Sequence, residues 1–199
     1  MKNLLHVGCG GHHILGKHGF SPDEWREIRL DINPAVKPDI IGTITDMRDV
    51  PDDSIDAVFS SHNLEHLYAH EVPKALAEFK RVLRDDGYAL IITPDIQEVA
   101  LMVAEGEILE TAYQSSAGPI TPLDIMYGHR PSLAQGNLYM AHHTAFTINS
   151  LRKELSGYFR DSLLQRHGFT LVAFATNGEY ETGYMLDKAH EFLGGKNVN

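Results

Sequence analysis

LLHVGCGG, residues 4–11, is the most informative stretch of this 199-residue chain. An apolar run that stops at a cluster of glycines predicts a buried strand followed by a tight turn. The glycines at positions 8, 10 and 11 carry no side chain, so a ligand can lie directly against the backbone. The third glycine of the dinucleotide-binding pattern is missing, because position 13 is a histidine. The turn therefore favours a nucleoside site and disfavours NAD and FAD.

A carboxylate follows at the end of the second predicted strand, EIRLD, residues 27–31. Asp31 comes about twenty residues after the glycine turn, where an acid can accept hydrogen bonds from both ribose hydroxyls of an adenosine. The alternative is a surface acid at a strand end. The preceding glycine turn favours the ribose interpretation.

Strands and helices alternate along the first half of the chain. Further strands are predicted at residues 39–44, 55–60 and 88–93, and apolar residues at helical spacing predict a helix over 71–84. This order is typical of a mainly parallel sheet with right-handed crossovers and a ligand at the carboxyl ends of its strands. Residues 12–22 lack a helical apolar stripe, so we expect a loop where many nucleotide folds have their first helix.

The second half is less regular. A segment rich in Gly, Pro and aromatic residues is longer than a plain connection needs, and we interpret about residues 107–146 as an insertion that acts as a lid. A helix over 150–165 and strands at 169–176 and 182–187 are expected to close the fold. A hairpin at Asn177-Gly178 would make the last strand antiparallel. We expect one domain over residues 1–199, an α/β Rossmann-like three-layer sandwich with a mostly parallel seven-stranded sheet.

The composition is that of an ordinary globular protein, with 43% hydrophobic and 22% charged residues. The formal net charge of −10 would repel a phosphate backbone, so no nucleic-acid partner is expected. Cys9 is the single cysteine, which excludes an internal disulfide and fits a reducing compartment. No stretch has the length of a signal-peptide core or of a membrane span. We therefore expect a cytoplasmic protein without membrane contact.

Six motifs, in order and over about residues 4–95, resemble those of the class I, type 11-like, Rossmann-like S-adenosylmethionine-dependent methyltransferases. The resemblance is greatest to their short-loop branch, which is often associated with glycan biosynthesis. The motifs are LHVGCG (5–10), LDINP (30–34), DM (46–47), PDDSID (51–56), HNLEH (62–66) and RVLRDDG (81–87). The resemblance implies the same fold, S-adenosylmethionine as cofactor and methyl transfer to a small-molecule acceptor, with a sugar or glycan precursor as one class.

The resemblance also implies which residues hold the cofactor. Asp31 would bind the ribose, and Ser61 and His62 would lie beside the sulfonium. The residues implied along the methionyl and ribose part are Gly8, Cys9, Gly10 and Gly11.

The adenine is assigned to the following motifs in the same way. Ile32 and Met47 would flank the ring, and Asp46 would accept a hydrogen bond from its amino group. None of the implied cofactor residues is a cation, which suits a cofactor without phosphates.

The implied reaction needs little acid–base chemistry, because an in-line displacement from a sulfonium mainly requires alignment and exclusion of water. A hydroxyl acceptor would benefit from a general base, for which His62 is the first candidate and His143 the second. The oligomeric state is left open, with a homodimer as one alternative.

Two departures from the family pattern leave a rival interpretation open. His6 stands where an acid often precedes the glycine turn, and His12 stands in place of the usual third glycine. Both suit a catalytically silent scaffold domain that binds S-adenosylmethionine without turnover. The segment His62 to His66 also matches the H-x-x-E-H signature of inverted zinc proteases. Because it follows a strand of a nucleotide-type sheet, we expect no metal there.

Overall fold

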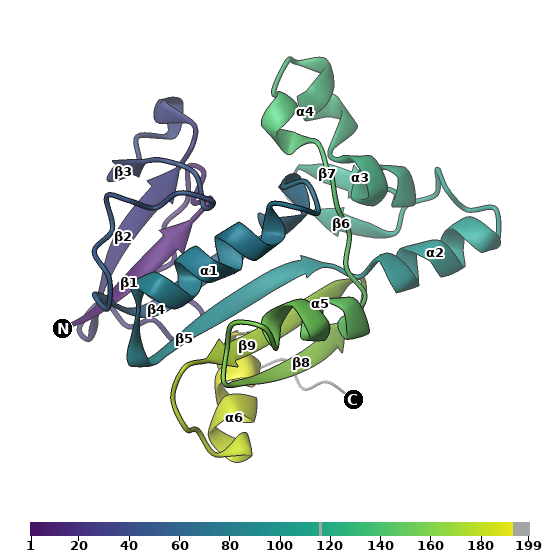
Figure 1. The fold of residues 1–199 in the computed structure, drawn as a ribbon. Helices are drawn as coiled ribbons and strands as arrows, with labels where there is room; N and C mark the ends of the chain where they lie inside the picture. Colours follow the sequence, from purple (N-terminus) through teal and green to yellow (C-terminus); the bar gives the residue numbers. More distant parts are fainter. Residues whose placement is uncertain (116, 193–199) are drawn as a thin grey trace.

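The computed structural model describes residues 1–115 and 117–192 (Figure 1). The strands of its central sheet are β1 (Lys2–Val7), β2 (Trp25–Asp31), β3 (Ile40–Ile41), β4 (Ile55–Ser61), β5 (Leu83–Pro94), β8 (Asp161–His167) and β9 (Thr170–Thr176). They form a seven-stranded sheet in the order β3-β2-β1-β4-β5-β9-β8. Strands β1 to β5 pair in parallel, whereas β9 runs antiparallel to both β5 and β8. The predicted mostly parallel sheet with an antiparallel last strand is confirmed.

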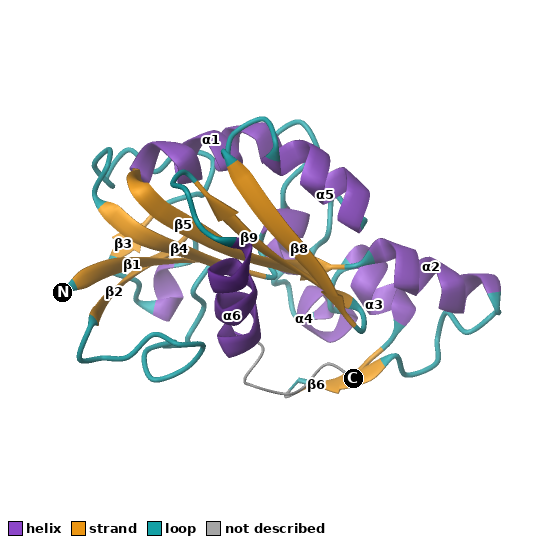
Figure 2. Ribbon diagram, turned by 90° about the horizontal axis from the view of Figure 1, so that it is seen from below, coloured by secondary structure: helices purple, strands orange, loops and turns teal. Residues whose placement is uncertain are grey.

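Helices cover both faces of this sheet and give it three layers. The helices are α1 (Val72–Val82), α2 (Ile96–Ala104), α3 (Pro122–Tyr127), α4 (Arg130–Ala134), α5 (Ile148–Leu155) and α6 (Thr182–Phe192). Short 3-10 turns are η1 (Pro34–Val36), η2 (Leu64–His66) and η3 (Leu138–Met140). Helices α1 and α5 lie on one face and α6 on the other (Figure 2). Within the described residues, no helix has the length and apolar character needed to cross a membrane.

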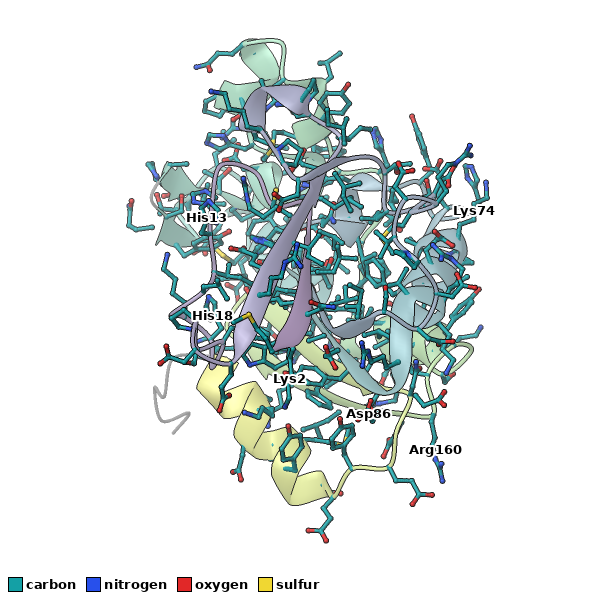
Figure 3. All side chains as sticks on the ribbon, turned by 90° about the vertical axis from the view of Figure 1, so that its left-hand side faces the viewer. Lys2, His13, His18, Lys74, Asp86 and Arg160 are labelled. Atoms are coloured by element: carbon teal, nitrogen blue, oxygen red, sulfur yellow. The ribbon has the colours of Figure 1, made fainter. Side chains whose placement is uncertain are left out.

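Successive side chains of β1 point to opposite faces of the sheet, so the strand contributes to a separate core on each face. Leu5 and Val7 pack beneath α1 and α5, whereas Leu4 points to the opposite face. On that second face, Ile14 and Phe20 of the loop between β1 and β2 contribute to the core in place of a helix. Figure 3 views the sheet from its β3 edge, with His13 and His18 of this loop on one side and Lys74 of α1 on the other. The predicted loop over residues 12–22 is confirmed.

The elements that close the fold differ from the sequence-based expectation. The helix predicted over 150–165 ends at Leu155, and its second half is strand β8. The strand predicted at 182–187 is helix α6, whose Met185 and Ala189 lie four residues apart and are both buried. The antiparallel strand arises from a hairpin at Gly168, whose φ of +55° suits a tight turn, and not from Asn177-Gly178. Short apolar runs fit either period, and here packing decided between them.

The third predicted strand, residues 39–44, is also shorter than expected. Only Ile40 and Ile41 pair with β2, opposite Leu30 and Asp31. This short edge strand ends beside the residue that carries the predicted ribose contact.

The segment 107–146 lies between α2 and α5, beyond the arrowhead of β5 (Figure 1). It contains a small hairpin, β6 (Tyr113–Ser115) with β7 (Gly118–Ile120), followed by α3 and α4. Val99 of α2, Ile120 and Ile125 form a separate small core beneath it. Its action as a lid stays a prediction.

Candidate active site

A cleft of about 730 Å³ opens at the carboxyl ends of the parallel strands. Its lower wall comes mainly from residues at the carboxyl ends of the five parallel strands, and its upper wall comes from segment 107–146. The strand-end residues in the lining include Gly8 and Gly10 after β1, Asp31 and Ile32 at the end of β2, Gly42 after β3, His62 and Asn63 after β4, and Pro94 of β5. The cleft is therefore at the position where open α/β sheets bind their ligands.

The glycine turn requires glycine for two separate reasons. Gly8 and Gly10 have φ angles of +61° and +51°, which side chains with a Cβ rarely adopt. A Cβ added to Gly8 would lie 2.7 Å from the Asn63 side chain, which would have to move. The backbone surface of the cleft is consequently bare.

Asp31 is held rigidly beside this turn. Its Oδ2 accepts a hydrogen bond from the Gly10 amide at 2.8 Å, and its Oδ1 accepts one from the Asn33 amide at 2.8 Å. Each carboxylate oxygen has a further lone pair. Asp31 can therefore accept two ribose hydroxyls while its orientation is fixed by the backbone.

Arg29 ties the turn to the neighbouring loops. Its guanidinium donates hydrogen bonds to the carbonyl oxygens of Gly10 at 2.6 Å, His12 at 3.2 Å and Lys37 at 3.0 Å. The sequence analysis did not single out this residue. A buried cation in the strand EIRLD was the available signal, because such a group must find several acceptors.

Glu27 provides the carboxylate that is missing at position 6, where this chain has a histidine. On the strand beside His6 it accepts hydrogen bonds from His6 Nδ1 at 2.8 Å, His13 Nδ1 at 2.9 Å and the Ile14 amide at 3.2 Å. Burial lowers the pKa of His6 even though Glu27 opposes the shift. The carboxylate that the family pattern often has on β1 is thus supplied here by β2. It anchors the β1–β2 loop, which takes the place of a first helix.

His62 occupies the end of β4 in an unusual conformation, with a φ of +50°. Its Nδ1 lies 3.2 Å from Glu65 Oε1, and Thr93 Oγ1 donates to Glu65 Oε2 at 3.2 Å. Non-glycine residues with positive φ concentrate at functional sites because the strain must be held by surrounding contacts. Here the buried Glu65, only 1% exposed, provides one of them.

Burial and the contact between His62 and Glu65 shift the pKa values of these two residues in opposite directions. Burial by itself would lower the pKa of His62 and raise that of Glu65. The hydrogen bond and the charge interaction between them outweigh burial, so the pKa of His62 is raised and that of Glu65 is lowered. The pair is therefore an imidazolium and a carboxylate over a wider pH range than usual.

Residues 141–144 of the upper wall dock directly onto η2. The amides of His143 and Thr144 donate to the Glu65 carbonyl at 2.8 and 3.2 Å, and His66 Nδ1 lies 3.0 Å from the Ala141 carbonyl. The rings of His66 and His142 meet at 4.8 Å between centroids. Segments that are far apart in the sequence therefore form one wall of the cleft.

Residues 5–91 match the model of a family described as a methyltransferase domain. The match covers somewhat less than half of the 199-residue chain, so this part of it is similar to methyltransferase domains. One solved structure with the same fold, described below, has S-adenosylhomocysteine bound. The glycine turn without side chains and the fixed carboxylate of Asp31 are suited to a nucleoside ligand.

Solved methyltransferases share the fold at low identity. The CurJ carbon methyltransferase aligns with a TM-score of 0.58 and 12% identity over 89% of this chain and 49% of that one. The present chain thus spans about half the length of that protein. A methyltransferase from Methanosarcina mazei described as SAM-dependent aligns with a TM-score of 0.54 and 14% identity, covering 89% of this chain and 93% of that one.

A third solved structure carries its ligands. It is the Burkholderia thailandensis 1,6-didemethyltoxoflavin-N1-methyltransferase, with bound 1,6-didemethyltoxoflavin and S-adenosylhomocysteine. It aligns with a TM-score of 0.52 and 14% identity over 89% of this chain and 71% of that one. No curated protein matches the sequence. At these identities the structural likeness establishes the fold alone.

The side of the cleft that was predicted to hold adenine differs in part from the prediction. Ile32 is 47% exposed and lines the cleft, as the flank of a base would. Met47 does not line it, because its side chain is 1% exposed within the main core. Asp46 is also outside the lining, and its carboxylate is paired with the Arg48 guanidinium at 3.0 Å. Ile44 of the same loop lies in the cleft wall instead.

Other predicted residues lie outside the cleft lining. Cys9 is buried beneath the glycine turn, and Gly11 and Ser61 are outside the cleft lining. His143 is exposed and stacks on Tyr68 at 4.3 Å, whereas the adjacent His142 lines the cleft. Burial lowers the pKa of His142, although Glu65 opposes the shift.

Asn63 is a site residue that the motif comparison did not single out. Its side chain lines the cleft next to Gly8, and its Nδ2 is buried without a hydrogen-bond partner among the described residues. A buried donor without a partner is costly, so a ligand that accepts its hydrogen bond would be favoured.

Proposed function

We propose that this protein transfers the methyl group of S-adenosylmethionine to a small-molecule acceptor bound in the cleft. The observation that carries the proposal is Asp31, oriented by two backbone amides beside a turn without side chains. A ribose has two adjacent hydroxyls that match the two free lone pairs of such a carboxylate.

The cofactor's other parts also find suitable surroundings. Ile32 offers an apolar surface for the adenine, and the Asn63 amide offers a donor beside the glycine turn. No helix lies between β1 and β2 in the described chain, so the turn lacks the helix N-terminus that binds pyrophosphate in dinucleotide enzymes. A nucleoside cofactor without phosphates is therefore favoured over NAD.

The acceptor is expected between His62 and the upper wall. His62 is 47% exposed in its side chain, so it can reach a ligand while Glu65 holds its other face. In the transfer, the carbon–sulfur bond breaks as the acceptor's lone pair forms the new bond to carbon, and the sulfonium becomes a neutral thioether. A hydroxyl acceptor also loses its proton, which His62 would take at a pH above its raised pKa, where its imidazole is neutral. Sugars and glycan precursors are thus one acceptor class to assay.

Calorimetry with S-adenosylhomocysteine tests the cofactor half of the proposal. The native chain should bind, and Asp31→Ala and Asp31→Asn should weaken binding by about 10- to 100-fold, since hydrogen bonds to a charged group are removed. Asp23→Ala, at an exposed acid on the β1–β2 loop, is the matched control. A native chain that gives no binding heat and no thermal stabilisation with this ligand would refute the proposal.

A catalytically silent scaffold domain is the alternative, and one observation favours it. His12 lines the cleft, at a position where the family pattern usually has a glycine without a side chain. If the chain is a scaffold, we expect it to bind S-adenosylmethionine without methylating any acceptor. If the chain is an enzyme, we expect the His62→Asn variant to retain S-adenosylhomocysteine binding and to lose methyl transfer, measured with labelled S-adenosylmethionine.

A further inference from the structure

Three ligand-type side chains converge where η2 meets the upper wall of the cleft. Glu65, His66 and His142 each offer one ligand atom, and these atoms all lie within 4.8 Å of one another. The glutamate is buried and the two histidines are half-buried, with both imidazoles in the cleft lining. Neither the domain family nor the methyl transfer proposed above requires this cluster.

The two imidazoles are oriented in the same way. His66 Nδ1 lies 3.0 Å from the Ala141 carbonyl oxygen, and His142 Nδ1 lies 2.7 Å from the Ile125 carbonyl oxygen. A carbonyl oxygen only accepts, so in each ring Nδ1 carries the hydrogen and the Nε2 of the neutral ring keeps a free lone pair. Histidine ligands of metals are held in this manner, by a carbonyl on the nitrogen that does not bind the ion.

Glu65 has the matching arrangement of a ligating carboxylate. Thr93 Oγ1 donates to its Oε2, and His62 Nδ1 contacts its Oε1, both at 3.2 Å. A carboxylate has about four lone-pair positions, so these two contacts leave positions for a cation. Hydrogen bonds to a ligating carboxylate fix its direction, as they do here.

We propose that Glu65, His66 and His142 form a binding site for a divalent transition cation of the Zn²⁺ type. Two imidazoles and one carboxylate are a ligand set that such ions favour, and three protein ligands leave a position open. That position faces the cleft, because His66 and His142 line it. Ligands at about 2.1 Å from an ion are at most about 4.2 Å apart, so atoms spread over up to 4.8 Å must draw slightly together.

This site differs from the one suggested by H-x-x-E-H in the sequence. That signature needs both histidines on one face of an α-helix. Here the segment is a three-residue 3-10 turn, and His62 precedes it with a positive φ and contacts the carboxylate instead. His142, far along the chain from His66, completes the cluster. A bound ion would therefore join segment 107–146 to the end of β4.

The test uses the full chain without a polyhistidine tag, freed of metal by a chelator. Zn²⁺ is titrated calorimetrically, and Co²⁺ is added as a spectroscopic probe whose visible absorption reports its ligands. We expect one ion per chain and weakening by about 100-fold or more in both His66→Asn and His142→Asn. His70→Asn, at an exposed histidine of the same segment outside the cluster, should bind as the native chain does.

Circular dichroism confirms that each variant is folded, and one folded variant of the two is enough. No one-to-one binding by the native chain would overturn the site, as would native affinity in a folded His66→Asn or His142→Asn variant. Equal loss in His70→Asn would do the same, since binding would then lie elsewhere. S-adenosylhomocysteine titrations of the same samples test the proposed function separately, so the two can fail independently.

Discussion

The two walls of the cleft are built by different means. The glycine-turn wall, residues 8–12 and 29–33, is held by backbone groups that Arg29 and Asp31 bind. The histidine wall, residues 62–66 and 141–144, is held by side chains and by a docked segment from far along the chain. The first wall has almost no freedom to vary in shape, whereas the second can be altered by single side chains. A constant cofactor would require the first kind of wall, and a variable acceptor would require the second.

The largest effect is expected from Gly8→Ala, which breaks the glycine-turn wall. The new Cβ would meet Asn63 at 2.7 Å, and alanine would have to adopt a φ of +61°. We expect the free energy of unfolding to fall by about 3 kcal/mol, measured by urea denaturation. Gly11→Ala is the control, because a Cβ added at Gly11 would have no atom within 4 Å. Equal losses in both variants would contradict the steric explanation.

Arg29→Met should cost somewhat less. The substitution keeps most of the apolar stem but removes the donors to the carbonyls of Gly10, His12 and Lys37. Partly exposed carbonyls regain some hydrogen bonds from water, so we expect a loss of about 2 kcal/mol in unfolding free energy. Arg26→Met, at an exposed arginine of the same strand, should change stability by less than about 0.5 kcal/mol. A stable Arg29→Met with native cofactor affinity would show that the turn keeps its shape unaided.

Thr93→Val examines the histidine wall. Valine is nearly the same size as threonine but cannot donate to Glu65 Oε2, so a buried carboxylate loses one of its donors. We expect a loss of about 1.5 kcal/mol in chemical denaturation. Thr93→Ser, which restores the hydroxyl, should recover part of this loss. If serine and valine were equally destabilising, packing and not the hydrogen bond would be responsible.

The smallest effect is a pH dependence located at His6. Burial lowers its pKa in the folded chain below the unfolded value of 6.5, and the facing groups are Glu27, Arg29 and His12. As pH falls through 6.5, the unfolded chain therefore takes up more protons at this site than the folded chain does, and stability decreases.

Unfolding free energies at about pH 7 and about pH 5.5 measure this contribution. His6→Asn should lose less stability than the native chain on acidification, by under about 1 kcal/mol. His13→Asn, at the exposed histidine that shares Glu27, provides the comparison. An unchanged difference between the two pH values in His6→Asn would show that other groups cause the dependence.

Much of the glycine-turn wall was predictable, because its parts are close in sequence and serve one backbone geometry. The turn, the β2 carboxylate and the missing first helix all follow from local patterns. The neighbours Arg29 and Glu27 were missed, since their partners are carbonyls and loop residues that sequence patterns do not reveal. Several features stay predictions. They are the residues that contact the cofactor, the lid role of 107–146, the single-domain organisation, the oligomeric state and the cytoplasmic location.

By itself, the sequence determined the parallel half of the sheet and the resemblance to methyltransferase domains, because strand periodicity, glycine position and motif spacing are properties of short segments. Only the tertiary structure decided that residues 161–167 form a strand and 182–192 a helix, since short apolar runs suit either period until they are packed. It also decided that His142, and not His143, faces the cleft beside His66. That choice depends on a hydrogen bond across 75 positions of the chain, between His66 and Ala141, which no local pattern encodes.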